Sequence, residues 1–134
     1  MRAIIREFIA FMSPPLLYGL LCLPQTGLLL AQYPNAVNSL GGTHNTGLVI
    51  TIEFIQLATL IICGAVIYFI AGQQPRYKLL KAGVVIEMLI IAIWVELQYW
   101  GAMPVWHHFV FFTLILFGIP MGSYLANRWR ITTA

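Results

Sequence analysis

Apolar residues gather in four long blocks that are separated by short polar stretches. A helix needs about 20 mostly apolar residues to cross a bilayer. The blocks lie at about 15–32, 47–71, 80–101 and 105–126. They predict an all-α integral membrane protein with four transmembrane helices, arranged as an antiparallel up-down bundle with short connections. The length of 134 residues predicts a single domain, 1–134.

The segment before the first block has a different pattern. Residues 3–12 are amphipathic and are followed by Ser13, Pro14 and Pro15. Proline removes a hydrogen bond from a helix and ends or kinks it. The pattern therefore predicts a short N-terminal helix, either interfacial or kinked, ahead of the first span.

Composition and charge agree with a membrane location. Hydrophobic residues make up 60% of the chain and charged residues 8%, whereas soluble domains carry roughly a quarter charged residues. All seven Lys and Arg lie before the first block, between the second and third, or after the fourth. The positive-inside rule then predicts a multi-pass protein with both termini cytoplasmic, most simply in the bacterial inner membrane. The scattered basic residues form no stripe and no nucleic-acid motif, so we expect no nucleic-acid partner.

Three carboxylates fall inside the apolar blocks, Glu53 in the second and Glu87 and Glu96 in the third. A charge at bilayer depth costs about 3 kcal/mol, so each acid should face protein, be paired or be neutral. The 1.5 Å rise per helical residue places Glu53 and Glu96 in the outer third of the membrane, with His107 and His108. Glu87 is expected to lie alone near the middle. The three carboxylates and the two histidines together form the candidate polar site.

Helical geometry adds two expectations for this site. Gln56 shares a helix face with Glu53 and is expected to hydrogen-bond to it. Glu87 and Glu96 are half a turn out of phase, so they should point in opposite directions, with Gln98 on the Glu87 face. Such a two-faced helix predicts cover by a neighbouring subunit or partner. In the alternative interpretation, Glu96 reaches water near the headgroups.

Carboxylates and imidazoles are also ligands for zinc, copper or iron. The candidate metal-binding residues are His44, Glu53, Glu96, His107 and His108. Adjacent helical residues diverge by about 100°, however, so at most one of the paired histidines should face a given ion. We therefore favour interfacial histidines wetted by water or headgroups over a metal site, with a proton relay or ligand pairing as further alternatives. Haem is strongly disfavoured, because only the fourth block has histidines inside a span.

Small residues indicate where helices pack. Gly118 and Gly122 form a small-xxx-small pair in the fourth block and predict a close helix–helix contact. Cys22 and Cys63 lie inside apolar blocks, where buried thiols usually behave as small hydrophobes.

No nucleophile–base pair and no phosphate-binding loop is recognisable, so catalysis is not expected. The pattern favours a non-catalytic subunit of, or partner in, a larger homo- or hetero-oligomeric membrane complex, in contact with lipid and with its own copies or other subunits. One alternative is a homo-oligomeric channel, or a proton- or metal-linked transporter that uses the intramembrane Glu and outer His residues. Another is a small redox or lipid-directed membrane enzyme. A bound lipid or quinone is left open.

Overall fold

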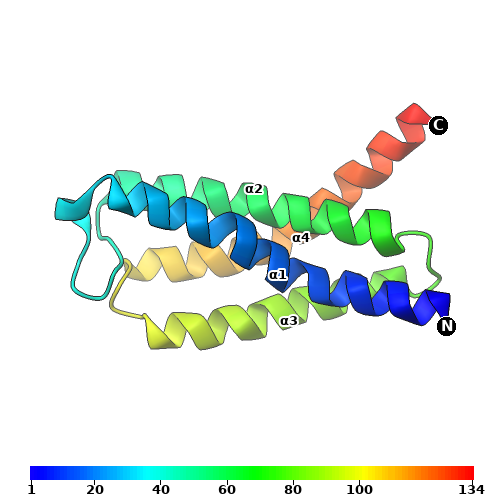
Figure 1. Ribbon diagram of the computed structural model, residues 1–134, viewed down its shortest axis with the longest axis horizontal. Coiled ribbons are helices and arrows are strands. Elements are labelled where there is room, and N and C mark those ends of the chain that lie inside the picture. The colour runs from blue at the N-terminus through cyan, green and yellow to red at the C-terminus, as the bar shows by residue number, and fades with distance from the viewer.

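The computed structural model describes residues 1–134 and contains four α-helices, one short 3₁₀-helix and no β-strand (Figure 1). The predicted all-α fold is confirmed. The elements are α1 Arg2–Ala31, η1 Pro34–Ala36, α2 Thr46–Ala71, α3 Tyr77–Gln98 and α4 Val105–Thr133. The predicted second block matches α2 closely, whereas α3 begins and ends three residues earlier than predicted. The fourth block is part of a longer helix that continues to Thr133.

Three of the helices, α1, α2 and α4, are long and apolar enough to cross a membrane. The remaining helix, α3, is set apart by its charges. Every 18-residue stretch of α3 contains three charged residues, whereas each of the other three helices has an 18-residue stretch with two at most. The charged residues of α3 are Lys78, Lys81, Glu87 and Glu96. The three apolar helices suggest a membrane protein.

Helix α1 runs without interruption through Pro14 and Pro15, so the prediction of a separate interfacial helix over 3–12 is wrong. Pro14 lacks the N–H that would bond to the carbonyl of Ala10. The Ser13 hydroxyl donates to that carbonyl instead, at 3.1 Å. The carbonyl of Pro14 accepts from the Cys63 thiol of α2, at 3.7 Å. The ribbon changes direction part-way along α1, which corresponds to the kinked alternative (Figure 1).

The helices alternate in direction along the chain, but their neighbours differ from those of a simple up-down bundle. Helix α2 packs extensively against α4 and α1, whereas α3 packs more lightly against α4 and α1. Helices α2 and α4 run in the same direction (Figure 1). The simplest up-down bundle would place α2 beside α3, but these two helices do not pack along each other.

Glycines explain why α2 and α4 form the closest pair. A Cβ atom added at Gly122 would lie 2.7 Å from the carbonyl carbon of Ile61 in α2. A Cβ atom at Gly118 would lie 2.9 Å from the Cβ of Leu60. Both separations are shorter than van der Waals contact. The two glycines therefore lie where α4 approaches α2 most closely, as small residues allow in helix pairs.

The two ends of the bundle differ in charge. Both termini and the α2–α3 connection lie at one end, and the α1–α2 loop and the α3–α4 turn lie at the other (Figure 1). All seven Lys and Arg belong to the first end. The separation of charge that was inferred from the sequence is therefore present in three dimensions.

At the opposite end, the α1–α2 loop closes onto the α3–α4 turn. The side-chain amide of Asn38 donates to the carbonyl of Ala102 at 2.8 Å. The backbone N–H of Thr43 donates to the sulfur of Met103 at 3.5 Å. Asn45 then caps α2, because its side-chain oxygen accepts from the N–H of Leu48. The loop contacts hold together the end of the bundle at which the candidate site lies.

Candidate functional site

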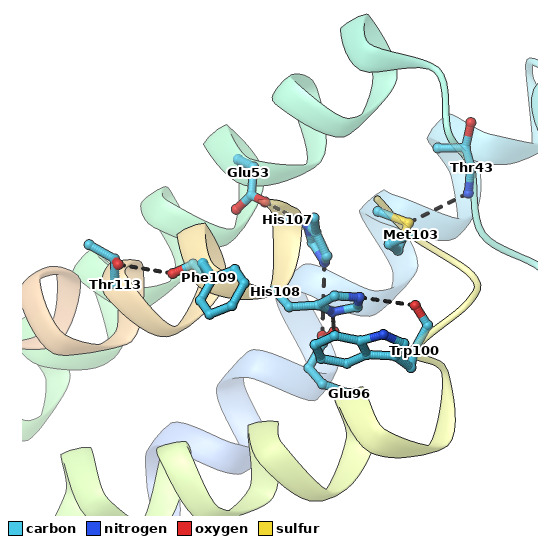
Figure 2. Close-up of polar contacts among 9 residues, drawn as sticks. All are labelled: Thr43, Glu53, Glu96, Trp100, Met103, His107, His108, Phe109 and Thr113. Carbon is cyan, nitrogen blue, oxygen red and sulfur yellow. Dashed lines mark hydrogen bonds and ion pairs between the residues drawn. The ribbon is translucent and has the colours of Figure 1, made fainter. Parts of the chain in front are cut away.

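Four ionisable side chains from three helices converge near this end of the bundle (Figure 2). Glu53 comes from α2, Glu96 from α3, and His107 and His108 from the first turn of α4. Their exposed fractions are 8%, 8%, 3% and 0%, respectively. The structure thus brings together four of the residues proposed from the sequence.

His107 is held by a carboxylate on one side of its ring. Its Nδ1 donates to Glu53 Oε1 at 2.5 Å. The other ring nitrogen, Nε2, lies 3.8 Å from Glu96 Oε1, too far for a hydrogen bond. The ring also stacks on Phe111, with an interplanar angle of 7°. The position and tilt of this imidazole are therefore fixed by α2 and by its own helix.

His108 is held by a backbone carbonyl instead. Its Nε2 donates to the carbonyl oxygen of Trp100 at 3.0 Å. Its Nδ1 is in direct contact with Glu96 Oε2. The imidazole lies parallel to the Trp100 indole, with ring centroids 4.2 Å apart (Figure 2). No feature of the sequence pointed to Trp100 as part of the site, because its backbone carbonyl supplies the contact.

The burial of these side chains contradicts two interpretations made from the sequence. The paired histidines are not wetted at an interface, and Glu96 does not extend to water. The predicted depth does not by itself expose these side chains to water, because other parts of the chain cover them. The side chain of Trp100 covers His108, and the α1–α2 loop closes over the turn that carries Trp100.

His44 lies outside the group, although the sequence had placed it among the candidate ligands. Its side chain is exposed, and its Nε2 lies 3.1 Å from the carbonyl oxygen of Gly101. This loop histidine helps to join the α1–α2 loop to the α3–α4 turn.

The remaining predicted polar residues have other surroundings. Gln56 is buried, but it forms no hydrogen bond to Glu53, so that prediction is wrong; its Oε1 atom is buried without a partner. Glu87 is half-buried, and its Oε2 atom also has no partner. Gln98 is exposed at the end of α3.

The difference between the two carboxylates of α3 follows from the helical repeat. Val84, Met88, Ala92 and Glu96 are spaced four residues apart and form the buried face of the helix. Glu87 lies outside this series. The structure thus supplies partners for Glu96 from within the chain and none for one oxygen of Glu87.

A cavity of about 310 Å³ borders the cluster, with a lining drawn from all four helices. Most of the lining is apolar. The polar exceptions are Tyr18, Gln56 and Glu96. Ligand pockets are typically about 300–1,000 Å³, mainly apolar, with a few polar groups that orient the ligand. Neither this cavity nor the place of Tyr18 in its wall was predicted, because a tyrosine in an apolar block carries no signal of what it faces.

Comparison with protein-family models, with curated proteins and with solved structures finds no match to this chain. The chemistry of the site offers two capacities. The Glu–His group can hold protons or a cation, and the cavity can hold an apolar molecule with a polar end.

Proposed function

We propose that this chain is an integral membrane protein that crosses the inner (cytoplasmic) membrane four times, with both termini in the cytoplasm. Three helices have the required length and hydropathy, and all seven Lys and Arg lie at one end. This distribution is the one that the positive-inside rule associates with the cytoplasmic side. For α3, burial of Glu96 within the bundle reduces the cost of crossing.

Reporter fusions test this topology. Green fluorescent protein fused after Ala134 is expected to fluoresce, whereas alkaline phosphatase is expected to be active only when inserted at Gly41, in the α1–α2 loop. Extraction of membranes at alkaline pH should leave the chain in the pellet. An active phosphatase at Ala134, or release of the chain into the soluble fraction, contradicts the proposal.

We further propose that the protein binds a small lipophilic molecule with a hydrogen-bonding head group, and that it does so as a non-catalytic component of a membrane complex. The observation that carries this proposal is the amide of Gln56. Its oxygen is buried without a partner, and the residue lies in the wall of a mostly apolar cavity. A buried polar atom left unsatisfied costs about 1–3 kcal/mol, so turning the amide toward a hydrogen-bonding group in the cavity is favoured.

The lining of the cavity indicates the class of ligand. Gln56 can accept a hydrogen bond and Tyr18 can donate one. The remaining walls suit a ring or an acyl chain. A quinol or a lipid with a hydroxyl group has both parts, and either can enter from the hydrocarbon layer.

A cavity-filling substitution tests ligand binding. Gly19 lines the cavity, and a Cβ atom there would meet nothing within 4 Å. Gly19→Phe should therefore place a ring in the cavity and remove a ligand that co-purifies with the wild-type protein. Native mass spectrometry in mild detergent measures the bound mass. Gly27→Phe is the matched control, because Gly27 lies on the same helix, outside the cavity, and also has open space.

Two outcomes contradict the ligand proposal. One is a wild-type protein that carries no lipophilic adduct and gains none when it is incubated with quinol or lipid. The other is an adduct that Gly19→Phe retains at the wild-type level.

The assignment to a complex is supported by Glu87. One of its carboxyl oxygens is buried without a partner on the helix that packs most lightly against the rest of the bundle. The other carboxyl oxygen of this half-buried side chain also forms no hydrogen bond within the chain and is not fully buried, so a donor on a neighbouring chain could pair with it. The same native spectra report whether the chain associates with copies of itself or with other subunits.

A further inference from the structure

The hydrogen bonds of the two histidines determine which ring nitrogens are free. A carboxylate oxygen of Glu53 and the carbonyl oxygen of Trp100 are both acceptors, so His107 Nδ1 and His108 Nε2 carry hydrogen. In a neutral imidazole, the other nitrogen then presents a lone pair. These atoms are His107 Nε2 and His108 Nδ1, and both lie beside the carboxylate of Glu96. Three electron-pair donors, namely these two nitrogens and the Glu96 carboxylate, therefore face one another with no N–H or O–H group between them.

The formal charge of the cluster points the same way. Glu53 and Glu96 bring two negative charges into a group that is more than nine-tenths buried. Every Lys and Arg lies at the opposite end of the bundle. Buried charges are normally paired or bound to a metal ion, because an uncompensated one is costly. A divalent cation supplies both the missing charge and an electron-pair acceptor.

We propose that Glu96, His107 and His108 bind a divalent transition-metal ion. Their ligand atoms all lie within 4.8 Å of one another. The separation of 3.8 Å between His107 Nε2 and Glu96 Oε1 is within the span of two metal–ligand bonds of about 2.0–2.1 Å each. Rotation of the flexible Glu96 side chain opens its contact with His108 and admits the ion.

Adjacent histidines can serve one ion here because they use different ring nitrogens. His107 offers Nε2, the nitrogen farther from its backbone, and His108 offers Nδ1, the nearer one. The rings lie at 67° to each other with centroids 5.5 Å apart. From the direction of the Cα–Cβ bonds alone, at most one of these histidines was expected to face an ion.

The surroundings of the ligands also resemble a metal site. Metal-binding histidines usually donate their other N–H to a carboxylate or a backbone carbonyl, which fixes the tautomer and the ring orientation. Glu53 and the Trp100 carbonyl are in these two positions. Two imidazoles and one carboxylate suit Zn²⁺, and Co²⁺ can replace it as a spectroscopic probe. Glu96 also lines the neighbouring cavity, but neither histidine does, so Zn²⁺ binding can be measured whether or not a ligand co-purifies.

Zinc binding to the purified full-length chain tests the proposal. After the affinity tag has been removed and the protein stripped with EDTA, titration calorimetry and elemental analysis should show one Zn²⁺ per chain. Substitution with Co²⁺ should give an absorption spectrum typical of nitrogen and oxygen ligands. His44→Ala, the control, should bind Zn²⁺ like the wild type, because His44 lies outside the cluster.

Glu53 is a positioning residue in this proposal. Glu53→Gln keeps an acceptor for His107 Nδ1 but removes the negative charge. It should weaken Zn²⁺ binding roughly 10–100-fold and leave the stoichiometry of one ion per chain unchanged. His108→Ala should abolish stoichiometric binding.

Several outcomes overturn the proposal. The first is a folded wild-type protein that takes up no Zn²⁺, which would mean that protons alone neutralise the cluster. The second is a Co²⁺ absorption spectrum without the features of nitrogen ligands. A third is loss of binding in His44→Ala while His108→Ala binds normally. If His108→Ala does not fold, the Co²⁺ spectrum of the wild-type protein decides the question.

Discussion

Gly122→Leu is expected to separate α4 from α2 and to lower the free energy of unfolding by about 3 kcal/mol or more. Even a methyl group at this position would lie 2.7 Å from the carbonyl carbon of Ile61. That carbonyl belongs to a helical backbone, so it cannot rotate away as a side chain can. The α2–α4 contact is the most extensive in the bundle, and the substitution therefore affects the whole fold.

Denaturant titration or thermal unfolding in mild detergent measures this effect. Gly122→Ala should show a smaller loss, about 1–3 kcal/mol. Gly27 provides the control, since it is also helical but has open space around its Cβ position. Gly27→Ala should be neutral or stabilising by up to about 1 kcal/mol, because alanine favours helix. Equal effects at the two glycines would show that α2 and α4 do not approach each other as described.

Features that depend on a local repeat were predictable from the sequence. The apolar blocks predicted four helices, and the cations predicted which loops lie at the same end. The rise per residue placed Glu53, Glu96 and the two histidines at similar depth, and the structure brings them together.

Features that depend on contacts between distant segments were not predictable. Pro14 and Pro15 predicted the end of a helix, but α1 continues through them: the Ser13 hydroxyl donates to the Ala10 carbonyl that Pro14 leaves free, and Cys63 of α2 contacts the Pro14 carbonyl. The burial of His108 depends on the ring of Trp100, a residue of the α3–α4 turn. Neither contact has a periodic signal in the sequence.

The order of the helices in the bundle was also beyond local reasoning. Hydropathy does not distinguish a neighbouring helix from lipid, so the simplest arrangement was assumed. The preference for the α2–α4 pair comes from where glycines remove side-chain bulk. Whether a glycine lies at a close helix–helix contact can be decided only when the helix that it faces is known.

Glu53→Leu is expected to lower the free energy of unfolding by about 1–3 kcal/mol, because it leaves the buried Nδ1–H of His107 without an acceptor. The Glu53 carboxylate accepts from His107 Nδ1 at 2.5 Å, and both side chains are at least nine-tenths buried. His107→Phe should cost more, about 3–5 kcal/mol, because it leaves a buried carboxylate unpaired. Unfolding is measured in EDTA, so that metal binding does not contribute.

The double substitution Glu53→Leu/His107→Phe gives the decisive comparison. Replacing both partners of a buried hydrogen bond by apolar groups of similar shape can be nearly neutral. Phenylalanine preserves the stacking on Phe111 that the imidazole ring makes. The double variant should therefore be more stable than either single variant. Contacting residues show coupling energies of about 0.5–3 kcal/mol in such cycles, and a strictly additive result would mean that Glu53 and His107 do not depend on each other for their burial.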